Sequence, residues 1–205
     1  MIRNATLNDL NAVVNIHMVA FPNFFLTSLG AMFLRELYLG FLNQKDGILI
    51  VADDDGMVVG FVAGTSAPDT FFRSMRKKRW FYFVYSALPA ILSSPLIVVK
   101  KLYMALFYSG DKPSTLTNGA LLSSIGVIPE AIGANVGLAL LNGFEREALL
   151  RNAEFVYLTT DEVGNERVKA FYEKCGYNIE SIFLQKVNRP MIRYLKKLNY
   201  RTTSF

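Results

Sequence analysis

The chain has 205 residues, of which 52% are hydrophobic and 19% charged, with a formal net charge of +5. This composition excludes a disordered or fibrous chain and predicts a single domain over residues 1–205. Its single cysteine, Cys175, excludes an intramolecular disulfide and zinc sites built from cysteine pairs, and its single histidine, His17, excludes most histidine-based triads. We therefore expect a reduced, cytoplasmic protein without a metal, and the N-terminal residues lack the features of a secretory signal.

Basic residues are concentrated in two segments, residues 73–101 and 184–205, neither of which contains an acid. These segments together carry a charge of +13, so the rest of the chain is acidic. The net charge is then poor evidence for binding to nucleic acid, and no recognisable nucleic-acid motif is present. We expect no nucleic-acid partner.

The first third of the sequence predicts two helices and a β-hairpin. Thr6 and Asp9 have the spacing of a capping box, so a helix should begin directly after them. Thr27 and Ser28 are expected to cap the second helix. The turn-forming residues 53–56 separate two apolar β-prone runs. The expected bounds are 10–21 and 29–42 for the helices, and 47–52 and 57–65 for the strands.

The last part of the sequence alternates strand and helix patterns, which is typical of an α/β fold with a mixed sheet flanked by helices. The expected strands are 120–128, 155–160 and 177–184, with a further strand at 191–198; the expected helices are 133–150 and 165–174. A glycine-bearing turn joins the first of these strands to the long helix. Backbone N–H groups at such a turn can bind an anion. We therefore expect the ligand-binding site at this turn.

Two segments of the sequence resemble the motifs of the GCN5-related N-acetyltransferases (GNAT). Residues 127–141, VIPEAIGANVGLALL, are similar to the acetyl-CoA-binding motif, and residues 165–177, NERVKAFYEKCGY, are similar to the second motif of that family. The resemblance covers residues 1–65 and 120–183 in the family's order. It implies a GNAT-like acyltransferase fold with a helical insertion, at about 68–112, between the third and fourth strands.

The resemblance further implies that acetyl-CoA is the co-substrate and that the turn holds its pyrophosphate. The residues in this role are Ile132, Gly133, Ala134, Asn135, Val136 and Gly137. The family usually has arginine or glutamine where this chain has Ile132, and glycine where it has Asn135. Because the pyrophosphate is held mainly by backbone N–H groups, and asparagine tolerates a left-handed conformation, the binding mode is expected to persist.

The resemblance also implies direct attack of a substrate amine on the thioester. The Val127 N–H would polarise the carbonyl, Tyr172 would protonate the departing sulfur, and Asn165 would bind the cofactor arm or the N-terminus of its helix. Many relatives have a glutamate base on the strand before the turn, but this strand has no acid. The base is either a water relay anchored by Ser124 or its neighbour Ser123, or a carboxylate from elsewhere.

Residues 80–99 form a run of twenty uncharged residues between basic clusters, long enough to cross a membrane. We reject a membrane span because it would separate the strands of one sheet, and Pro89 and Pro95 would interrupt the helix. We expect a helical insertion that bends near these prolines. Its role stays open between a lid, a contact with an anionic membrane through 73–101, a site for a phosphate-bearing substrate, and a packed hairpin. Its aromatic residues are Phe71, Phe72, Trp80, Phe81, Tyr82, Phe83 and Tyr85.

The tail is expected to form a closing strand with basic alternate positions. Arg189 and Arg193 could bind an anionic acceptor, although an edge strand protected by its cations is the favoured interpretation. The function predicted overall is acetyl transfer to a small-molecule amine, such as a nucleotide-linked amino sugar. The alternative is a non-catalytic acyl-CoA-binding or peripheral membrane interaction module. The sequence leaves open whether the protein forms a homodimer.

Overall fold

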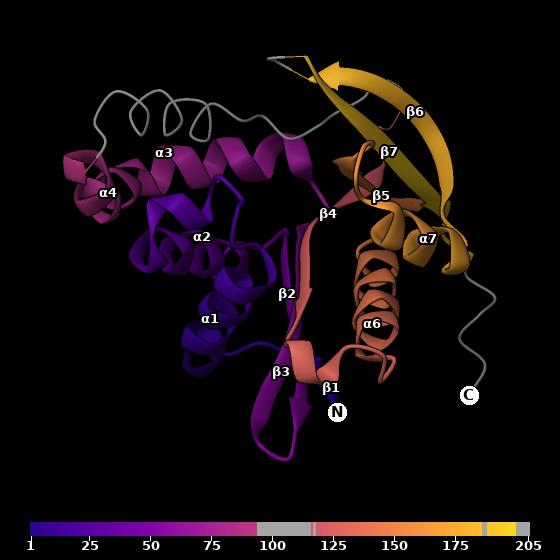
Figure 1. The fold of residues 1–205 in the computed structure, drawn as a ribbon, viewed down its shortest axis with the longest axis horizontal. Coiled ribbons are helices and arrows are strands. Elements are labelled where there is room, and N and C mark those ends of the chain that lie inside the picture. The colour runs from indigo at the N-terminus through magenta and orange to yellow at the C-terminus, as the bar shows by residue number, and fades with distance from the viewer. Residues whose placement is uncertain (94–115, 117, 186–187, 200–205) are drawn as a thin grey trace.

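The computed structural model describes residues 1–93, 116, 118–185 and 188–199, and these residues form a seven-stranded mixed sheet with helices on both faces (Figure 1). The strand order is β1-β2-β3-β4-β5-β7-β6; β4 and β5 are parallel, and the other neighbours are antiparallel. The predicted α/β class is therefore confirmed. The strands are β1 Ile2–Asn4, β2 Gly47–Asp54, β3 Met57–Thr65, β4 Gly119–Val127, β5 Phe155–Asp161, β6 Asn178–Gln185 and β7 Arg189–Lys197.

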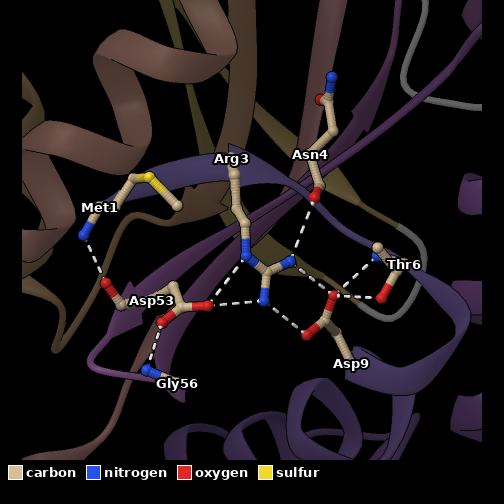
Figure 2. Close-up of polar contacts among 7 residues, drawn as sticks. All are labelled: Met1, Arg3, Asn4, Thr6, Asp9, Asp53 and Gly56. Atoms are coloured by element: carbon tan, nitrogen blue, oxygen red, sulfur yellow. Dashed lines mark hydrogen bonds and ion pairs between the residues drawn. The ribbon is translucent and has the colours of Figure 1, made fainter.

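The N-terminus is fixed by the predicted capping box. A short 3-10 helix, Leu7–Asp9, leads directly into α1, Leu10–Ala20. The Asp9 carboxylate accepts bonds from the Thr6 backbone N–H at 2.7 Å and the Thr6 hydroxyl at 2.8 Å. Arg3 donates to the two oxygens of Asp9 at 2.8 and 2.9 Å and also binds Asp53 in the β2–β3 turn (Figure 2). This network ties β1, the start of α1 and the hairpin together.

The second helix, α2, spans Ala31–Asn43, and its predicted cap is wrong. Gly30, at φ 92°, is the N-cap residue, and a 3-10 turn, Thr27–Leu29, precedes it. The Thr27 hydroxyl donates to the Phe21 carbonyl at 2.6 Å, and the Ser28 hydroxyl donates to the Phe25 carbonyl at 2.6 Å. These hydroxyls therefore close the loop between α1 and α2 instead of capping α2.

The predicted hairpin is confirmed, with β2 and β3 joined by a tight turn. Asp55 and Gly56 both have positive φ, 47° and 87°, as a two-residue turn that matches the strand twist requires. Asp53 begins the turn by accepting a 2.8 Å bond from the Gly56 N–H. Its carboxylate is thus bound both by the hairpin and by Arg3.

Each face of the sheet has its own apolar core. Helices α1, α2 and α3 cover one face, and α6 and α7 cover the other (Figure 1). The bounds are α3 Pro68–Ser86, α4 Leu88–Ser93, α6 Val136–Leu150 and α7 Glu166–Lys174. Leu34, Tyr38 and Phe61 are fully buried in the first core, and Leu140, Phe144 and Tyr194 in the second.

The segment between β3 and β4 is helical where it is described. Helix α3 ends at Ser86 and α4 begins at Leu88, so the helix is interrupted at Ala87, two residues before Pro89. Pro95 and most of the predicted insertion beyond α4 lie outside the described residues. In the ranges that the structure describes, none of the helices has both the length and the apolarity needed to cross a bilayer.

The two C-terminal strands form a hairpin at one end of the sheet. The predicted extra strand is confirmed as β7, which lies between β5 and β6. The interpretation of this tail as an edge strand is wrong, because β6 occupies the edge. The chain reaches β6 first and then returns to insert β7 beside β5, an order that local patterns do not encode.

Candidate functional site

The strands β4 and β5 separate halfway along their length. They are paired only at Gly119–Phe155, Ala120–Val156 and Leu121–Tyr157. Beyond Leu121, β4 continues to Val127 beside β3, while β5 continues beside β7. The second half of β4 therefore presents backbone polar groups on its β5 side that none of the described strands satisfies, and such groups can bind a ligand instead.

A β-bulge lies at the start of this unpaired half. Ala63 is opposite Ser124 and Gly64 is opposite Leu122, so Ser123 is an extra residue in β4. Bulges redirect side chains and are common beside active sites. Ser124 is half-buried, and Ser123 is exposed.

The direction of the Val127 N–H follows from its neighbour. The Ile128 N–H donates to the Val59 carbonyl on β3 at 2.9 Å. Successive N–H groups of an extended chain point to opposite sides, so the Val127 N–H is directed away from β3. This is the side on which β5 has separated from β4.

The turn after β4 has a backbone suited to an anion. A 3-10 turn, Pro129–Ala131, is followed by Gly133 at φ 95° and by Asn135 at φ 57°, the N-cap residue of α6. The left-handed Asn135 fits the tolerance expected of asparagine. Within this turn and the start of α6, the N–H groups of Gly133, Asn135, Val136 and Gly137 have no acceptor among the described residues. They lie at the positive end of the α6 dipole.

Ile132 replaces a cation without disturbing this backbone. Its side chain is 50% exposed, and its N–H donates to the Pro129 carbonyl at 3.2 Å. The position is therefore at the surface, beside the free N–H groups. The turn can hold an anion through its backbone and the α6 dipole, with no side-chain charge from residue 132.

The two sequence motifs meet where α6 contacts α7. Val127, Val136 and Phe171 all pack against the apolar cluster that contains Tyr172. A Cβ atom placed on Gly137 would lie 3.5 Å from the Phe171 ring, which shows how closely the first turn of α6 approaches α7. Tyr172 thus lies on the same face of the sheet as the turn.

Tyr172 is 4% exposed, and its ring lies 5.6 Å from the ring of Tyr177 and 5.9 Å from that of Tyr194. Burial raises the pKa of Tyr172 far above its ordinary value, so the phenol is protonated at neutral pH. Across the residues that the structure describes, its hydroxyl has no hydrogen-bond partner. A neutral phenol of this kind can donate a hydrogen bond to a developing anion.

Asn165 occupies the N-cap position of α7, but its side chain is used elsewhere. Its amide donates a 2.6 Å bond to the Thr160 hydroxyl at the end of β5, and no side-chain bond caps the helix. Its carbonyl accepts the N–H groups of Val168 and Lys169. Asn165 therefore links the end of β5 to the start of α7.

On the opposite face of the sheet lies a buried polar pair that the sequence analysis did not find. The Tyr38 hydroxyl and His17 Nδ1 are 2.6 Å apart, and both residues are fully buried. Burial lowers the pKa of His17 to about 4 and raises that of Tyr38 above its ordinary value. No short motif marks this pair, because His17 lies on α1 and Tyr38 lies on α2.

Three cations of the tail are paired with carboxylates. Arg193 pairs with Glu180 at 2.8 Å, Arg189 pairs with Asp161, and Lys196 pairs with Glu145 at 2.7 Å. Arg193 is only 7% exposed and lies over the Phe183 ring. These ion pairs satisfy the side chains that the sequence suggested for an anionic acceptor.

Comparison with known proteins gives a family match to part of the chain and a shared fold. Residues 104–177 match the model of the acetyltransferase (GNAT) family, and no curated protein matches the chain. A solved aminoglycoside 6′-acetyltransferase type Ii is 18% identical, with 98% of this chain and 99% of that chain covered and a TM-score of 0.63. An aminoglycoside 6′-N-acetyltransferase complexed with coenzyme A is 16% identical, with 98% of each chain covered and a TM-score of 0.61.

A ribosomal-protein-alanine N-acetyltransferase from Brucella melitensis is 20% identical, with 97% of this chain and 99% of that chain covered and a TM-score of 0.62. At these identities the solved structures show a shared fold. The family match includes both segments from which the resemblance was drawn, residues 127–141 and 165–177, and confirms that resemblance.

Proposed function

Since the chain carries a GNAT acetyltransferase domain, we propose that it transfers the acetyl group of acetyl-CoA to a primary amine of a small molecule. The observation that carries the proposal is the anion-binding turn at residues 132–137, which directly follows the unpaired half of β4. This arrangement supplies backbone donors at one end of an open strand edge. A long ligand with a phosphate group can use both.

The residues of the turn fit the pyrophosphate of acetyl-CoA. Gly133 and Asn135 hold the positive φ angles that orient the backbone, and the free N–H groups at the start of α6 are donors for phosphate oxygens. When bound, acetyl-CoA supplies an activated acyl group as a thioester. The open edge of β4 supports an extended position for its amide-containing arm, because that arm can form strand-like hydrogen bonds.

Val127 and Tyr172 are proposed to stabilise the two charges that develop during transfer. The Val127 N–H, directed away from β3, would donate to the thioester carbonyl oxygen as negative charge forms there. Tyr172 would donate its phenolic proton in a hydrogen bond to the departing sulfur. Its raised pKa keeps that proton in place until the sulfur becomes anionic. Asn165 would position the start of α7 through Thr160.

The acceptor amine is proposed to approach from the side of the sheet covered by α1 and α2, where Ser124 is half-buried. We propose a small phosphate-bearing amine, such as a nucleotide-linked amino sugar. Because Arg189 and Arg193 are paired with acids, support for this class now comes from the exposed cations of α3: Arg73, Lys77 and Lys78. In this proposal α3 and α4 belong to an acceptor-binding insertion at about 68–112.

The test is titration calorimetry followed by an assay of thiol release. We expect acetyl-CoA and CoA to bind, and a pantetheine fragment without the pyrophosphate to bind far more weakly. Candidate acceptors are an amino-sugar nucleotide, an amino-sugar phosphate, an aminoglycoside and a peptide with a free N-terminus. The proposal fails if acetyl-CoA does not bind, or if none of these amines is acetylated.

One observation favours a second function, peripheral contact with a membrane. The exposed residues Trp80, Phe81, Tyr82 and Tyr85 follow Lys77 and Lys78 on α3. Aromatic side chains beside lysines suit the interface of an anionic bilayer. Co-sedimentation with anionic vesicles at low salt tests this candidate, with neutral vesicles as the control. Binding to both kinds of vesicle or to neither would argue against it.

A further inference from the structure

We infer that Glu145 of α6 is a positioning residue that fixes the Tyr172 phenol relative to the anion-binding turn at residues 132–137. This inference rests on the proposed function and deepens it, because it names what holds Tyr172 in place. The turn directly precedes α6, whereas Tyr172 lies on α7. The distance between the turn and the phenol therefore depends on how the two helices are held together.

The Glu145 carboxylate is the centre of a polar network that joins α6 to two other parts of the chain. It accepts a bond from the Tyr177 hydroxyl at 3.1 Å and bonds from Lys196 of β7 at 2.7 and 2.9 Å. The Lys196 Nζ also lies 5.6 Å from the centre of the Tyr177 ring. Burial and the Glu145 charge raise the pKa of Tyr177 far above its ordinary value, so this phenol keeps its proton and donates.

Tyr177 connects this network to Tyr172 through both its ring and its backbone. The two rings lie 5.6 Å apart at an angle of 64°, and both residues are buried. The Tyr177 N–H donates to the Tyr172 carbonyl at 3.0 Å, across the end of α7, where Gly176 has a φ of 83°. Because buried side chains are closely packed, a displacement of Tyr177 would move Tyr172 as well.

Helix α7 and the residues that follow it contact α6 at two separate places. Near the start of α6, a Cβ atom placed on Gly137 would lie 3.5 Å from the Phe171 ring. Glu145, which binds Tyr177, lies eight positions after Gly137 on the same helix, or about 12 Å further along its axis. One contact would leave α7 free to pivot over α6. Two contacts fix its direction as well as its separation.

The hydroxyls of three neighbouring tyrosines are used differently. Tyr177 donates to Glu145, and Tyr194 donates to Glu173 at 2.9 Å. The Tyr172 hydroxyl has no hydrogen-bond partner among the residues that the structure describes. Glu173 is an exposed residue of α7, so the bond from Tyr194 does not involve α6. The cluster thus holds the Tyr172 ring and leaves its hydroxyl available to a ligand.

The charge of Glu145 adds a directional contact that apolar packing does not supply. Its side chain is only 13% exposed, and burying a carboxylate carries a desolvation cost that its partners merely offset. Apolar side chains of similar volume could fill the same space with comparable stability. Bonds from Tyr177 and Lys196 to the two carboxylate oxygens instead restrict this contact to one arrangement.

The first arm of the test measures amide hydrogen exchange of the whole chain by nuclear magnetic resonance, without acetyl-CoA or an acceptor. Glu145→Leu removes the acceptor of Tyr177 and Lys196. The N–H groups of Cys175, Gly176 and Tyr177 donate to carbonyls of α7 and close its last turn. We expect them to exchange about tenfold faster in the variant, while the amides of β2 and β3 keep their wild-type rates.

Glu147→Leu is the matched control. Glu147 lies on the same helix, its side chain is 17% exposed, and it pairs with Arg151 at 3.6 Å. The last turn of α7 should exchange in this variant as it does in wild-type protein. Equal exchange rates there in Glu145→Leu and Glu147→Leu would overturn the inference that Glu145 holds the end of α7.

The second arm measures turnover with an amine that wild-type protein acetylates. We expect Glu145→Leu to lower kcat about tenfold with little change in the KM for acetyl-CoA, because the turn still binds the cofactor while the phenol is misplaced. Glu145→Gln keeps an acceptor for Tyr177 and should retain more activity than Glu145→Leu. Glu147→Leu should leave both constants unchanged.

A double variant separates positioning from a general loss of stability. If Glu145 acts through the Tyr172 phenol, then Glu145→Leu should cause no further loss of kcat in a Tyr172→Phe background. Additive losses, or an unchanged kcat in folded Glu145→Leu, would overturn the positioning role. If Glu145→Leu does not fold, Glu145→Gln takes its place in both arms.

Failure of the proposed function has a different signature. If wild-type protein acetylates none of the amines tested, or if Tyr172→Phe alone has wild-type kcat, the role of Tyr172 in turnover fails and the positioning role fails with it. The exchange rates still decide whether Glu145 holds the end of α7 against α6, because that arm requires no reaction.

Discussion

Leu121 and Tyr157 form the last pair that joins β4 to β5 before the two strands separate. This position sets the length of the open strand edge, because β4 continues beside β3 to Val127 and then enters the turn at residues 132–137. The edge and the turn are therefore continuous along the chain. A ligand with a phosphate at one end and amides along its length would contact both without any rearrangement of the sheet.

The positive φ of Gly133 gives the first prediction. In Gly133→Ala the added Cβ meets no atom within 4 Å, so the substitution acts only through backbone strain at φ 95°. We expect a loss of about 1–2 kcal/mol in the free energy of unfolding, or a shift of the turn that weakens acetyl-CoA binding about tenfold or more. Thermal denaturation and calorimetric titration measure the two effects.

Gly56→Ala is the matched control for this change. Gly56 has a similar φ of 87° and equally open surroundings, but it lies in the β2–β3 turn. It should lose comparable stability and bind acetyl-CoA as wild-type protein does. If both variants bound acetyl-CoA equally well, the turn would not hold the cofactor.

The second prediction concerns the apolar side chain of Ile132. Because this side chain is 50% exposed beside free N–H groups, Ile132→Arg should fold normally and add a cation to the anion-binding turn. We expect acetyl-CoA to bind about three- to tenfold more tightly, with a stronger salt dependence, since charge-assisted contacts to phosphate contribute about 1 kcal/mol or more. Ile182→Arg, at a 60% exposed position on β6, adds the same charge away from the turn and should leave the affinity unchanged.

The elements that the sequence predicted well are those with local determinants. The capping box of Thr6 and Asp9, the Asp55–Gly56 turn and the left-handed Asn135 each depend on a few adjacent residues, and each was found where expected. The segments around 132–137 and 165–172, which resemble the family's motifs, are local in the same sense. Their positions in the sheet follow from the strand–turn–helix order.

The features that the sequence could not predict depend on packing between distant segments. His17 and Tyr38 are 21 residues apart and meet only because α1 and α2 pack together on one face of the sheet. Likewise, β7 passes inside β6, so Arg193 becomes buried against Glu180 instead of standing on an edge. Neither arrangement follows from spacing or periodicity.

The third prediction separates binding from turnover at Tyr172. Tyr172→Phe keeps the ring in contact with Tyr177 and Tyr194 and removes only the hydroxyl. We expect kcat to fall about ten- to a hundredfold, because general-acid assistance to the sulfur is lost, with little change in acetyl-CoA affinity. Tyr194→Phe is the control, since its hydroxyl bonds to Glu173 on α7. A folded Tyr172→Phe with wild-type kcat would remove Tyr172 from the mechanism.

The last prediction concerns acid stability and the Arg3 network shown in Figure 2. Arg3 holds the pKa of Asp9 far below its usual range, mainly through side-chain hydrogen bonds. A carboxylate whose pKa is lower in the folded state stabilises the protein above its unfolded pKa of about 4, and this contribution is lost as the pH falls through the folded value. Wild-type protein should therefore lose stability progressively below about pH 5.

Arg3→Met should lower the free energy of unfolding at pH 7 by about 2 kcal/mol, since Asp9 would keep its bonds to Thr6 but lose a bidentate partner. The same variant should lose less stability than wild-type protein between pH 7 and pH 3, because the pKa of Asp9 would move back toward its ordinary value. Arg3→Lys keeps the charge without the planar fork and should lie between the two. Urea denaturation at a series of pH values measures all three proteins. Parallel stability curves for wild-type protein and Arg3→Met would show that Arg3 does not control the ionisation of Asp9.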